Sequence, residues 1–450
     1  MRVRTKLNMR LVQMVLLVAA AASMGRAQTA MPLSLKRAVE IALAPDGNTR
    51  VALAQEFIEQ ARTQQAQARA TLLPNLDGSV QEHRQVNNLQ AFGFNFKLPI
   101  PGFSIPSIVG PFNIFDARAS AQQTVFNLAD LRRYKASKVS AAATASDAVT
   151  TRNSVSDEVA RDYLACLRAE ADRTTARANV DLSEALLALA QRQKNAGTGT
   201  GIEVTRAEVQ LANDRQSLIR AENDRNRATL TLLKAMGLRL DAPVEFTNKL
   251  EYKQIDTAAD DALVEQARKA RPEMKTQQQR EDAARMSLGA VKDERLPSVG
   301  AAADYGTIGP DIATAHPTYT LGVSLKVPIF DGGRREARIG ESASQYRQEQ
   351  LRTRDLNQQI DLQVRTAVDS LHSAAAEVQS ATEGQTLAES ELAQARRRYE
   401  AGVATSVEVT DAQTRLQRAR DNLVKALYDH SMARLDLATA TGTIGEYVNQ

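Results

Sequence analysis

Residues 402–416 read GVATSVEVTDAQTRL and repeat the pattern of residues 197–211, GTGTGIEVTRAEVQL, at an offset of 205 positions. The match continues without a gap until Gly237 falls on Gly442. Shared helical composition produces scattered Ala and Leu matches, but not an ungapped run with a glycine at each end. We therefore expect an internal duplication. The expected parts are a first structural repeat over 28–240, a linker over 241–256 and a second repeat over 257–450.

On either side of this segment, each repeat contains the same series of predicted helices. A first helix is interrupted near a proline and ends at a Leu-Pro pair, and a very long helix, a glycine turn and a returning helix follow later. The first helices are expected at 35–72, interrupted at 45–47, and at 258–295, interrupted at Pro272, and the long helices at 128–196 and 334–401. Helices of nearly 70 residues extend roughly 100 Å, so we expect them to pack as a long antiparallel bundle or coiled coil.

Two extended segments precede each long helix, and the clearest of them ends at Phe330. Apolar residues alternate there with small or polar ones, which predicts a strand with one apolar face. The alternating apolar residues are Tyr319, Leu321, Val323, Leu325, Val327 and Ile329. The equivalent segment of repeat one keeps this parity, with Ala117, Ala119 and Ala121 on one side. Strands are expected at about 75–92, 113–126, 298–308 and 318–330, and a loop rich in Phe, Pro and Gly at 92–112.

The predicted strands are long enough to cross a bilayer, which takes about 9 to 11 residues. We therefore expect an apolar stripe that faces lipid, consisting of Tyr319, Leu321, Val323, Leu325 and Val327. Four strands are too few to close a barrel, which needs about eight, so closure requires an oligomer in which each chain contributes four strands. The expected fold is mainly α, a helical bundle with a β-barrel part that several chains share. The alternative is a water-soluble sandwich, which the chain disfavours because no second sheet is predicted.

The N-terminal segment has the pattern of a cleaved secretory signal peptide, expected at 1–27. Four basic residues precede an apolar run at 11–22, and Gly25-Arg26-Ala27 supplies small residues at the cleavage site. A membrane anchor is the alternative, but spanning takes roughly 20 apolar residues and this run is shorter. The leader holds five of the basic residues and no acid, so the formal charge of +4 becomes −1 without it. The remaining chain offers no electrostatic basis for binding nucleic acid.

The composition contains no pattern typical of an enzyme or a metalloprotein. A single cysteine, Cys166, excludes an intrachain disulfide and cysteine-rich zinc sites, and the four histidines lack metal-ligand spacing. No P-loop, dinucleotide-binding, nucleophile-elbow or HExxH motif is present. We expect Cys166 to be a small packed helix residue, and we expect no catalytic residue, cofactor or metal.

The sequence resembles the TolC-like outer-membrane efflux protein family, the outer membrane factors. The resemblance rests on the duplicated layout, on the segment from Pro328 to Arg334, PIFDGGR, and on Tyr399 to Gly402, YEAG, followed by SVEVTDA at 406–412. It covers nearly the whole chain after the leader. The family implies a homotrimer with a shared transmembrane β-barrel in the outer membrane of a Gram-negative bacterium. It also implies a helical tunnel that extends into the periplasm.

The resemblance further implies a function and a set of partners. The function is that of a passive exit duct in a tripartite efflux or type I secretion system. The implied partners are the outer-membrane lipid, a periplasmic adaptor (a membrane fusion protein) and an inner-membrane pump of the RND or ABC type. The alternative function is a periplasmic coiled-coil scaffold or adaptor without a membrane channel. The alternating strand at 318–330 favours the duct, because a scaffold has no use for a lipid-facing stripe.

By the same resemblance, Glu408 and Asp411 match acidic positions that line the periplasmic aperture, and Tyr399 matches an aromatic residue that helps to latch it. Glu203 is the repeat-one counterpart of Glu408 and is also a candidate. The chain departs from the family at Ala404, where some members carry an arginine that ties the aperture helices together. From the residues alone, Thr200 to Glu203 and Thr405 to Glu408 also read as capping boxes at helix starts.

Two glycines mark the turns after the long helices. Gly197 and Gly402 stand where a helix ends and a left-handed backbone conformation is favoured. We expect these turns to form the tips of the two helical hairpins. By the family resemblance, the tips are where the adaptor docks.

Overall fold

The computed structural model describes residues 31–93, 106–255 and 259–449. The expected signal peptide at 1–27 lies outside the described residues. Contacts divide the chain into two compact units, which we describe separately. Unit 1 comprises 1–53, 151–270 and 360–450, and unit 2 comprises 54–150 and 271–359. Each unit therefore takes segments from both predicted repeats.

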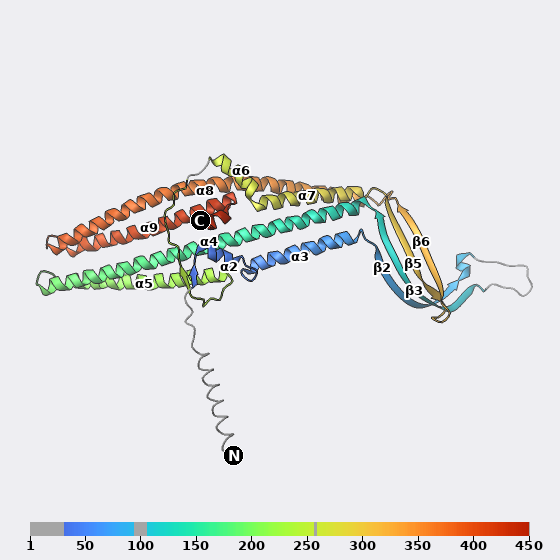
Figure 1. Ribbon diagram of the computed structural model, residues 1–450, viewed down its shortest axis with the longest axis horizontal. Helices are drawn as coiled ribbons and strands as arrows, with labels where there is room; N and C mark the ends of the chain where they lie inside the picture. The colour runs from blue at the N-terminus through green and yellow to red at the C-terminus, as the bar shows by residue number, and fades with distance from the viewer. Residues whose placement is uncertain (1–30, 94–105, 256–258, 450) are drawn as a thin grey trace, which may run out of the picture. The chain divides into compact units, whose positions relative to one another are not determined.

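The helices agree closely with those expected from the sequence. They are α2 (Leu35–Ala42), α3 (Thr49–Ala70), α4 (Leu128–Asn195), α5 (Gly201–Ala235), α6 (Asp260–Ala270), α7 (Pro272–Asp293), α8 (Arg334–Glu400), α9 (Ser406–Thr441) and α10 (Ile444–Val448) (Figure 1). The two long helices, α4 and α8, have 68 and 67 residues. Pro272 begins α7, a position where its missing N–H has no helical partner to lose. Within the described ranges, none of the helices is both long and apolar enough to span a membrane.

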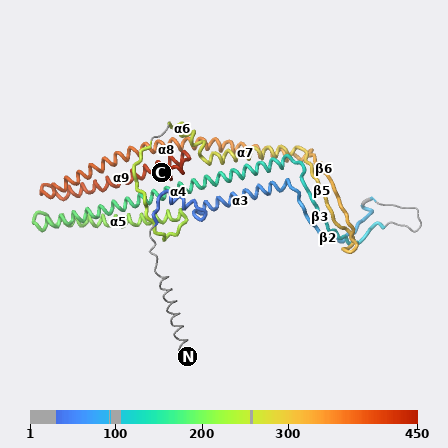
Figure 2. The backbone as a smooth tube through the Cα atoms, viewed as in Figure 1, coloured from blue at the N-terminus to red at the C-terminus, as the bar shows by residue number. Residues whose placement is uncertain are grey.

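Unit 2 contains a four-stranded antiparallel sheet (Figure 2). Its strands are β2 (Asn75–Asn88), β3 (Ile108–Phe126), β5 (Ser298–Gly309) and β6 (His316–Lys326), in the spatial order β2-β3-β5-β6. The central pair, β3 and β5, joins the strands of the two repeats, with Ala119 opposite Tyr305. Among the described residues, β2 and β6 each pair on one side only, so both edges of the sheet carry unpaired backbone groups.

Three predicted strand boundaries differ from the structure. The last strand ends at Lys326 rather than 330, because Pro328 has no N–H to donate to a neighbouring strand. The first strand ends at Asn88, whose side chain accepts hydrogen bonds from the N–H groups of the short helix η1 (Leu89–Phe92). The loop predicted at 92–112 is wrong for 108–112, which belong to β3, while 94–105 lie outside the described residues.

The register confirms the predicted separation of the sheet into two faces. Leu321 lies opposite Ala303, Ala303 opposite Ala121, and Ala121 opposite Leu76, so each of the four strands contributes apolar residues to one face. On the other face, one row across the strands consists of Asp77, Ser120, Asp304 and Thr320. A sheet with one apolar and one polar face separates two different environments.

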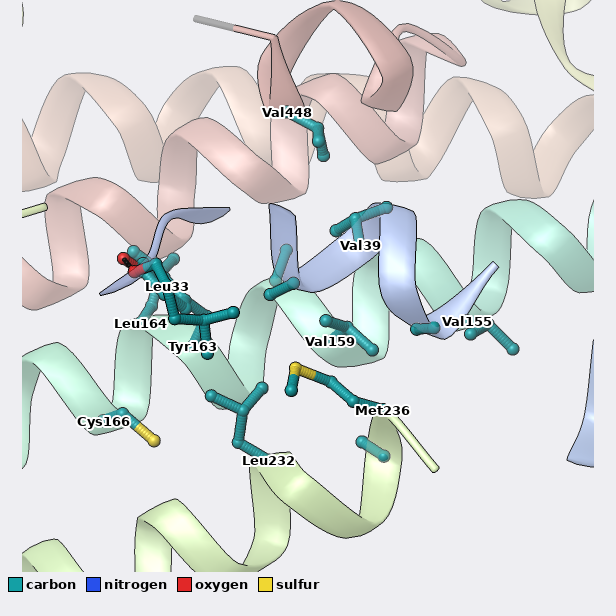
Figure 3. Close-up of a cluster of buried hydrophobic side chains, with 14 of the residues drawn as sticks. Leu33, Val39, Val155, Val159, Tyr163, Leu164, Cys166, Leu232, Met236 and Val448 are labelled. Carbon is teal, nitrogen blue, oxygen red and sulfur yellow. Dashed lines mark hydrogen bonds between the residues drawn. The ribbon is translucent and has the colours of Figure 1, made fainter. Parts of the chain in front are cut away.

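Unit 1 is built on a hydrophobic core that joins both ends of the described part of the chain to the helices. A short parallel pair, β1 (Met31–Leu33) and β4 (Val244–Phe246), brings the start of the described chain to the linker between the repeats. The hydroxyl of Tyr163 on α4 donates to the Leu33 carbonyl at 2.8 Å, and Figure 3 shows these two residues beside Leu164. Cys166 is fully buried in the same cluster, as expected, and burial raises the pKa of its thiol to about 12.

Candidate functional site

The candidate site lies where the long helices turn back. In unit 1, α4 and α5 form a first hairpin and α8 and α9 form a second one (Figure 1). Ion pairs hold each hairpin together, as between Arg215 and Glu184 in the first and between Arg415 and Glu391 in the second. The turns of the two hairpins occupy 196–200 and 401–405.

Both turns use the expected glycine. Gly197 has φ of +77° and Gly402 has φ of +73°, in the left-handed region. The N–H of Gly197 donates to the Lys194 carbonyl at 3.1 Å, and that of Gly402 donates to the Tyr399 carbonyl at 3.0 Å. A side chain at either position would strain the backbone, because L residues rarely adopt this conformation. The prediction of left-handed glycines at both turns is confirmed.

The two equivalent glutamates after the turns have different partners. Thr200 and Glu203 form the predicted capping box, in which the Thr200 N–H donates to a Glu203 carboxylate oxygen at 2.8 Å. The corresponding capping box at Thr405 is wrong, because its side chain makes no cap hydrogen bond. Glu408 instead pairs with Arg398 of α8 at 3.4 Å. The carboxylate that was expected to cap α9 thus contacts an arginine in the last turn of α8.

Tyr399, the candidate latch residue, is part of a buried cluster within the second hairpin and the adjoining α4. Its side chain is only 6% exposed and packs with Leu189, Val409 and Leu416. Its hydroxyl has no hydrogen-bond partner among the described residues. Burial raises the pKa of this hydroxyl, and the nearby charge of Glu203 raises it further. Tyr399 thus lies inside the protein, where its side chain packs in the hydrophobic cluster and is not available at the surface.

Two hydrogen bonds join the hairpins near their turns. Arg206 of α5 donates to the Ser406 hydroxyl of α9 at 2.7 Å. Gln193 of α4 donates to the Tyr399 carbonyl at 3.1 Å. A small cavity lies at this junction, and Glu203, Arg206, Tyr399 and Ser406 are among the residues that line it. The structure therefore brings two of the predicted site residues, Glu203 and Tyr399, together with an arginine that was not predicted as a site residue.

Further along the helices, a buried polar network connects the same hairpins. Asp214 of α5 is 2% exposed and accepts hydrogen bonds from Ser183 of α4 and from Gln210. Gln413 of α9 donates to the Ser183 hydroxyl at 2.6 Å. Every side chain of this network is satisfied by its neighbours, as buried polar groups require. The network was missed, although Asp214 follows the buried Leu211 by three residues and therefore shares its helix face.

Glu408 and Asp411 remain accessible in the single chain. Both residues are exposed, and they stand three positions apart, on one face of α9. Within the described ranges, Asp411 makes no ion pair, whereas Glu408 has Arg398. The repeat-one position that corresponds to Asp411 is Arg206, which is engaged with Ser406. The hairpins therefore differ in charge at this pair of matching positions, because the second has an acid where the first has an arginine.

A second candidate surface is the apolar face of the sheet in unit 2. The expected lipid-facing side chains are strongly exposed, from 52% at Val327 to 80% at Leu321. Val327 lies just beyond the end of β6, whereas Tyr319, Leu321, Val323 and Leu325 lie within it. Leu76 and Val80 extend the exposed apolar surface to β2, each at 74%. Exposure of so many large apolar side chains on one face marks a surface that contacts lipid or protein.

The polar face of the sheet carries a charged cluster across β3 and β5. Arg118 forms an ion pair with Asp116, which is 5% exposed, and contacts Asp304 at 3.4 Å. Gly306 stands opposite Arg118, and a Cβ there would lie 2.5 Å from the Arg118 Cβ. The glycine therefore leaves the space that the arginine occupies. Neither residue was predicted to belong to a site.

A family model described as outer membrane efflux protein matches residues 41–238 and 263–443 of this chain. Among curated proteins, the chain is 26% identical over 404 residues to the pyoverdine export outer membrane protein OpmQ of Pseudomonas aeruginosa, covering 85% of this chain and 81% of that protein. It is 23% identical over 350 residues to the alkaline protease secretion protein AprF of the same species, covering 74% and 71%.

Solved structures support the same fold. The CmeC outer membrane channel of Campylobacter jejuni aligns with a TM-score of 0.78 at 16% identity, over 92% of this chain and 88% of that one. A membrane protein of Pseudomonas aeruginosa gives the same TM-score at 20% identity, covering 91% and 93%. The long helical hairpins and the four-stranded sheet are thus shared with outer-membrane channel structures.

Proposed function

The chain belongs to the outer membrane efflux protein family, and we propose that three copies of it assemble around a common axis to form the duct. The protein is an outer-membrane channel that conducts substrates passively from the periplasm to the outside of the cell. It acts within an efflux or secretion system, and it reaches from the outer membrane into the periplasm. Members of the family are channels rather than enzymes, and we infer that this chain also has no catalytic activity.

The observation that carries the trimer is the sheet of unit 2. Its two edges are unpaired within the described chain, and its apolar face is exposed. Four strands cannot close on themselves, whereas the edge strands β2 and β6 of neighbouring chains can pair and complete a barrel. In that arrangement Tyr319, Leu321, Val323 and Leu325 face lipid, with Val327 at the margin, and the row with Asp116 and Arg118 faces the water-filled interior.

We place the periplasmic aperture at the turns of the hairpins. Glu408 and Asp411 supply exposed carboxylates on one face of α9, and three copies of each give an acidic ring. Glu203 caps α5, and Tyr399 packs inside the second hairpin, so these two residues hold the aperture helices in position. The Arg206 to Ser406 hydrogen bond joins the hairpins in a chain where position 404 is alanine.

We place adaptor docking at the tips, around Gly197 and Gly402. Ile202 in the first turn of α5 and Val403 next to Gly402 are 66% and 68% exposed, which suits contact with another protein. The energy for transport comes from an inner-membrane pump through that adaptor, because the chain has no nucleotide-binding motif. The names of the relatives include both pyoverdine export and alkaline protease secretion, and a duct of this kind serves either.

The division into two structural repeats, 28–240 and 257–450 with a linker at 241–256, remains our proposal for the origin of the chain. It explains why β3 and β5 pair at the centre of the sheet and why the two hairpins have glycine turns at matching positions. Cleavage of the leader at 1–27 would release the mature chain into the periplasm for assembly.

Conductance in planar lipid bilayers tests the function. The full-length protein, purified in detergent and added to one side of the bilayer, is expected to give stepwise increases in current. The control is the same preparation after heat denaturation, which should give none. A native oligomer that binds membranes but never conducts, even after its aperture is loosened by Arg206→Ala, would contradict the duct and favour the scaffold.

A further inference from the structure

A cavity in unit 1 lies under the segment that links the two repeats, and we call it the linker cavity. Its volume is about 600 Å³. Its walls come from the start of α2, from α4 around Leu164 and Leu167, from residues 247–253 of the linker, from α9 and from α10. All these segments belong to unit 1. None of its lining residues belongs to the hairpin turns or to the sheet, so neither candidate surface described above accounts for it.

The charges around the linker cavity are strongly unequal. Lys36, Lys249, Lys253 and Arg434 line it, while Glu251 is the one acid among its lining residues. The three lysines are exposed, and none of them forms an ion pair with a described residue. Arg434 is 8% exposed, and its guanidinium carbon lies 5.5 Å from the centre of the Tyr447 ring. An anionic ligand would relieve the repulsion among the three exposed lysines.

The walls of the same cavity also include apolar side chains. Leu164 and Leu167 of α4, Leu250 of the linker and Val448 of α10 line it. Such a lining can bury aliphatic side chains, which adds affinity that a small inorganic anion could not use. The lining therefore fits a ligand that carries both carboxylates and apolar groups.

The linker segment also presents backbone groups without partners. From Lys249 to Ile255, no backbone N–H or carbonyl forms a backbone hydrogen bond to another described residue. The segment nevertheless contacts α9, because the ring of Tyr252 packs in a tilted arrangement against that of His430, with 4.8 Å between the ring centres. It continues directly from β4, which already pairs with β1. An extended peptide can add to such a segment through main-chain hydrogen bonds.

We propose that the linker cavity binds a short acidic peptide segment of a partner protein. Its carboxylates contact Lys36, Lys249 and Lys253, its backbone lies along the linker, and its aliphatic side chains enter between Leu164 and Leu250. This site is separate from the tips at Gly197 and Gly402 that we assign to the adaptor. The inference does not depend on channel conductance, so either proposal can fail without the other.

Fluorescence anisotropy with the full-length, detergent-purified oligomer tests this site. The probe is a fluorescein-labelled peptide of alternating Glu and Leu residues, and its comparison peptide has Gln in place of Glu. The acidic peptide is expected to bind about tenfold more tightly than the Gln peptide, because the cavity lining is basic. Equal binding of the two peptides, or no binding of either, would overturn the proposal. The second result would mean that another copy of this chain covers the cavity in the oligomer.

A charge-reversed variant locates the binding. The triple change Lys36→Glu, Lys249→Glu and Lys253→Glu should weaken binding of the acidic peptide about tenfold or more. The matched control changes Lys269, Lys275 and Lys292 to Glu, because these lysines are also exposed and are not among the residues that line the cavity. An equal loss in the control would show that net charge, and not this cavity, attracts the peptide.

A third measurement separates a peptide from a small anion. Glutarate, which has two carboxylates and no peptide backbone, is used as a competitor against the labelled peptide. We expect displacement only at concentrations at least about a hundredfold above the peptide's dissociation constant, since glutarate lacks the apolar and main-chain contacts. If glutarate displaces the peptide at concentrations near the peptide's dissociation constant, the ligand is a small dicarboxylate and the peptide proposal is wrong.

Discussion

At the level of single residues, equivalent positions in the two hairpins have taken different partners. Glu203 caps the helix that follows it, whereas Glu408 reaches back to Arg398 on the preceding helix. Arg206 ties α5 to α9 through Ser406, whereas its counterpart Asp411 has no ion pair among the described residues. The backbone is thus alike in both hairpins, whereas the side chains at the starts of α5 and α9 make different interactions.

The aperture acids give the first residue-level prediction. Neutralising both, as Glu408→Gln with Asp411→Asn, should lower the cation-to-anion permeability ratio about twofold or more and weaken block by divalent cations, because an acidic ring concentrates cations. Reversal potentials in salt gradients across planar bilayers measure the ratio. The yield of oligomer should not change.

The control for that variant is Glu383→Gln with Glu389→Gln on α8. These glutamates are exposed as well, and their loss changes the net charge of the chain by the same amount. Selectivity that falls equally in the control would reflect total charge rather than a ring. If the Glu408 and Asp411 variant keeps wild-type selectivity and divalent block, the assignment of these residues to the aperture is wrong.

The Arg206 to Ser406 hydrogen bond gives the second residue-level prediction. Removing it with Arg206→Ala takes away a charge-assisted contact between half-buried side chains, worth about 1 kcal/mol after allowing for solvent. If this contact favours the closed arrangement, the open-to-closed ratio should rise about fivefold, which single-channel open probability measures. Arg227→Ala on the exposed side of α5 serves as the control and should leave the open probability unchanged. An unchanged open probability in Arg206→Ala would show that the bond only supports packing.

At the level of secondary structure elements, the long helices bury their apolar side chains, whereas the strands expose theirs. The helices α4 and α8 bury their apolar residues against other helices, as Leu189 and Leu392 do near the second hairpin. The strands leave theirs exposed on one face, with Leu321 at 80% and Val323 at 77%. An exposed apolar face is stable only where its surroundings are also apolar, which is why we assign the sheet to the membrane.

The parity of β6 can be tested by one pair of substitutions. Val323→Arg places a charge on the apolar face near the middle of the strand, which should cost roughly 2 to 4 kcal/mol of folding free energy in a bilayer. Ser324→Arg places the same charge on the polar face and should cost much less. Urea-induced unfolding from lipid vesicles measures both. Equal losses would refute the assignment of these faces.

At the level of the whole molecule, a single chain forms only part of the proposed barrel and aperture. Both sheet edges are open, and Asp411 of α9 makes no ion pair among the described residues. Three chains would pair six sheet edges and bring three copies of Asp411 together. We predict that native mass spectrometry of the detergent-purified protein gives three chains per particle. A monomer that keeps its full β-sheet signal in circular dichroism would contradict the shared barrel.

The amino-acid sequence by itself determined the elements and the duplication. Helix boundaries came within one or two residues of the structure, because proline, glycine and hydrophobic periodicity act over a few neighbouring residues. The two faces of the sheet were predictable for the same reason, since side chains alternate along any strand. The predictions were less accurate where several partners were available to one side chain. At Thr405 the expected capping box is absent, and Glu408 pairs instead with Arg398 of the preceding helix.

Only the tertiary structure decided which distant residues meet. Gln413 bonds to Ser183 across 230 positions, and Met31 pairs with Val244 in a short parallel strand pair. No local pattern encodes these contacts, because they depend on how whole helices and the linker pack against one another. The same holds for the buried Asp214 and for the linker cavity, where Lys36, Lys249 and Arg434 come together from three separate segments. A lysine in a sequence is most often solvated, and packing alone gathers several around one cavity.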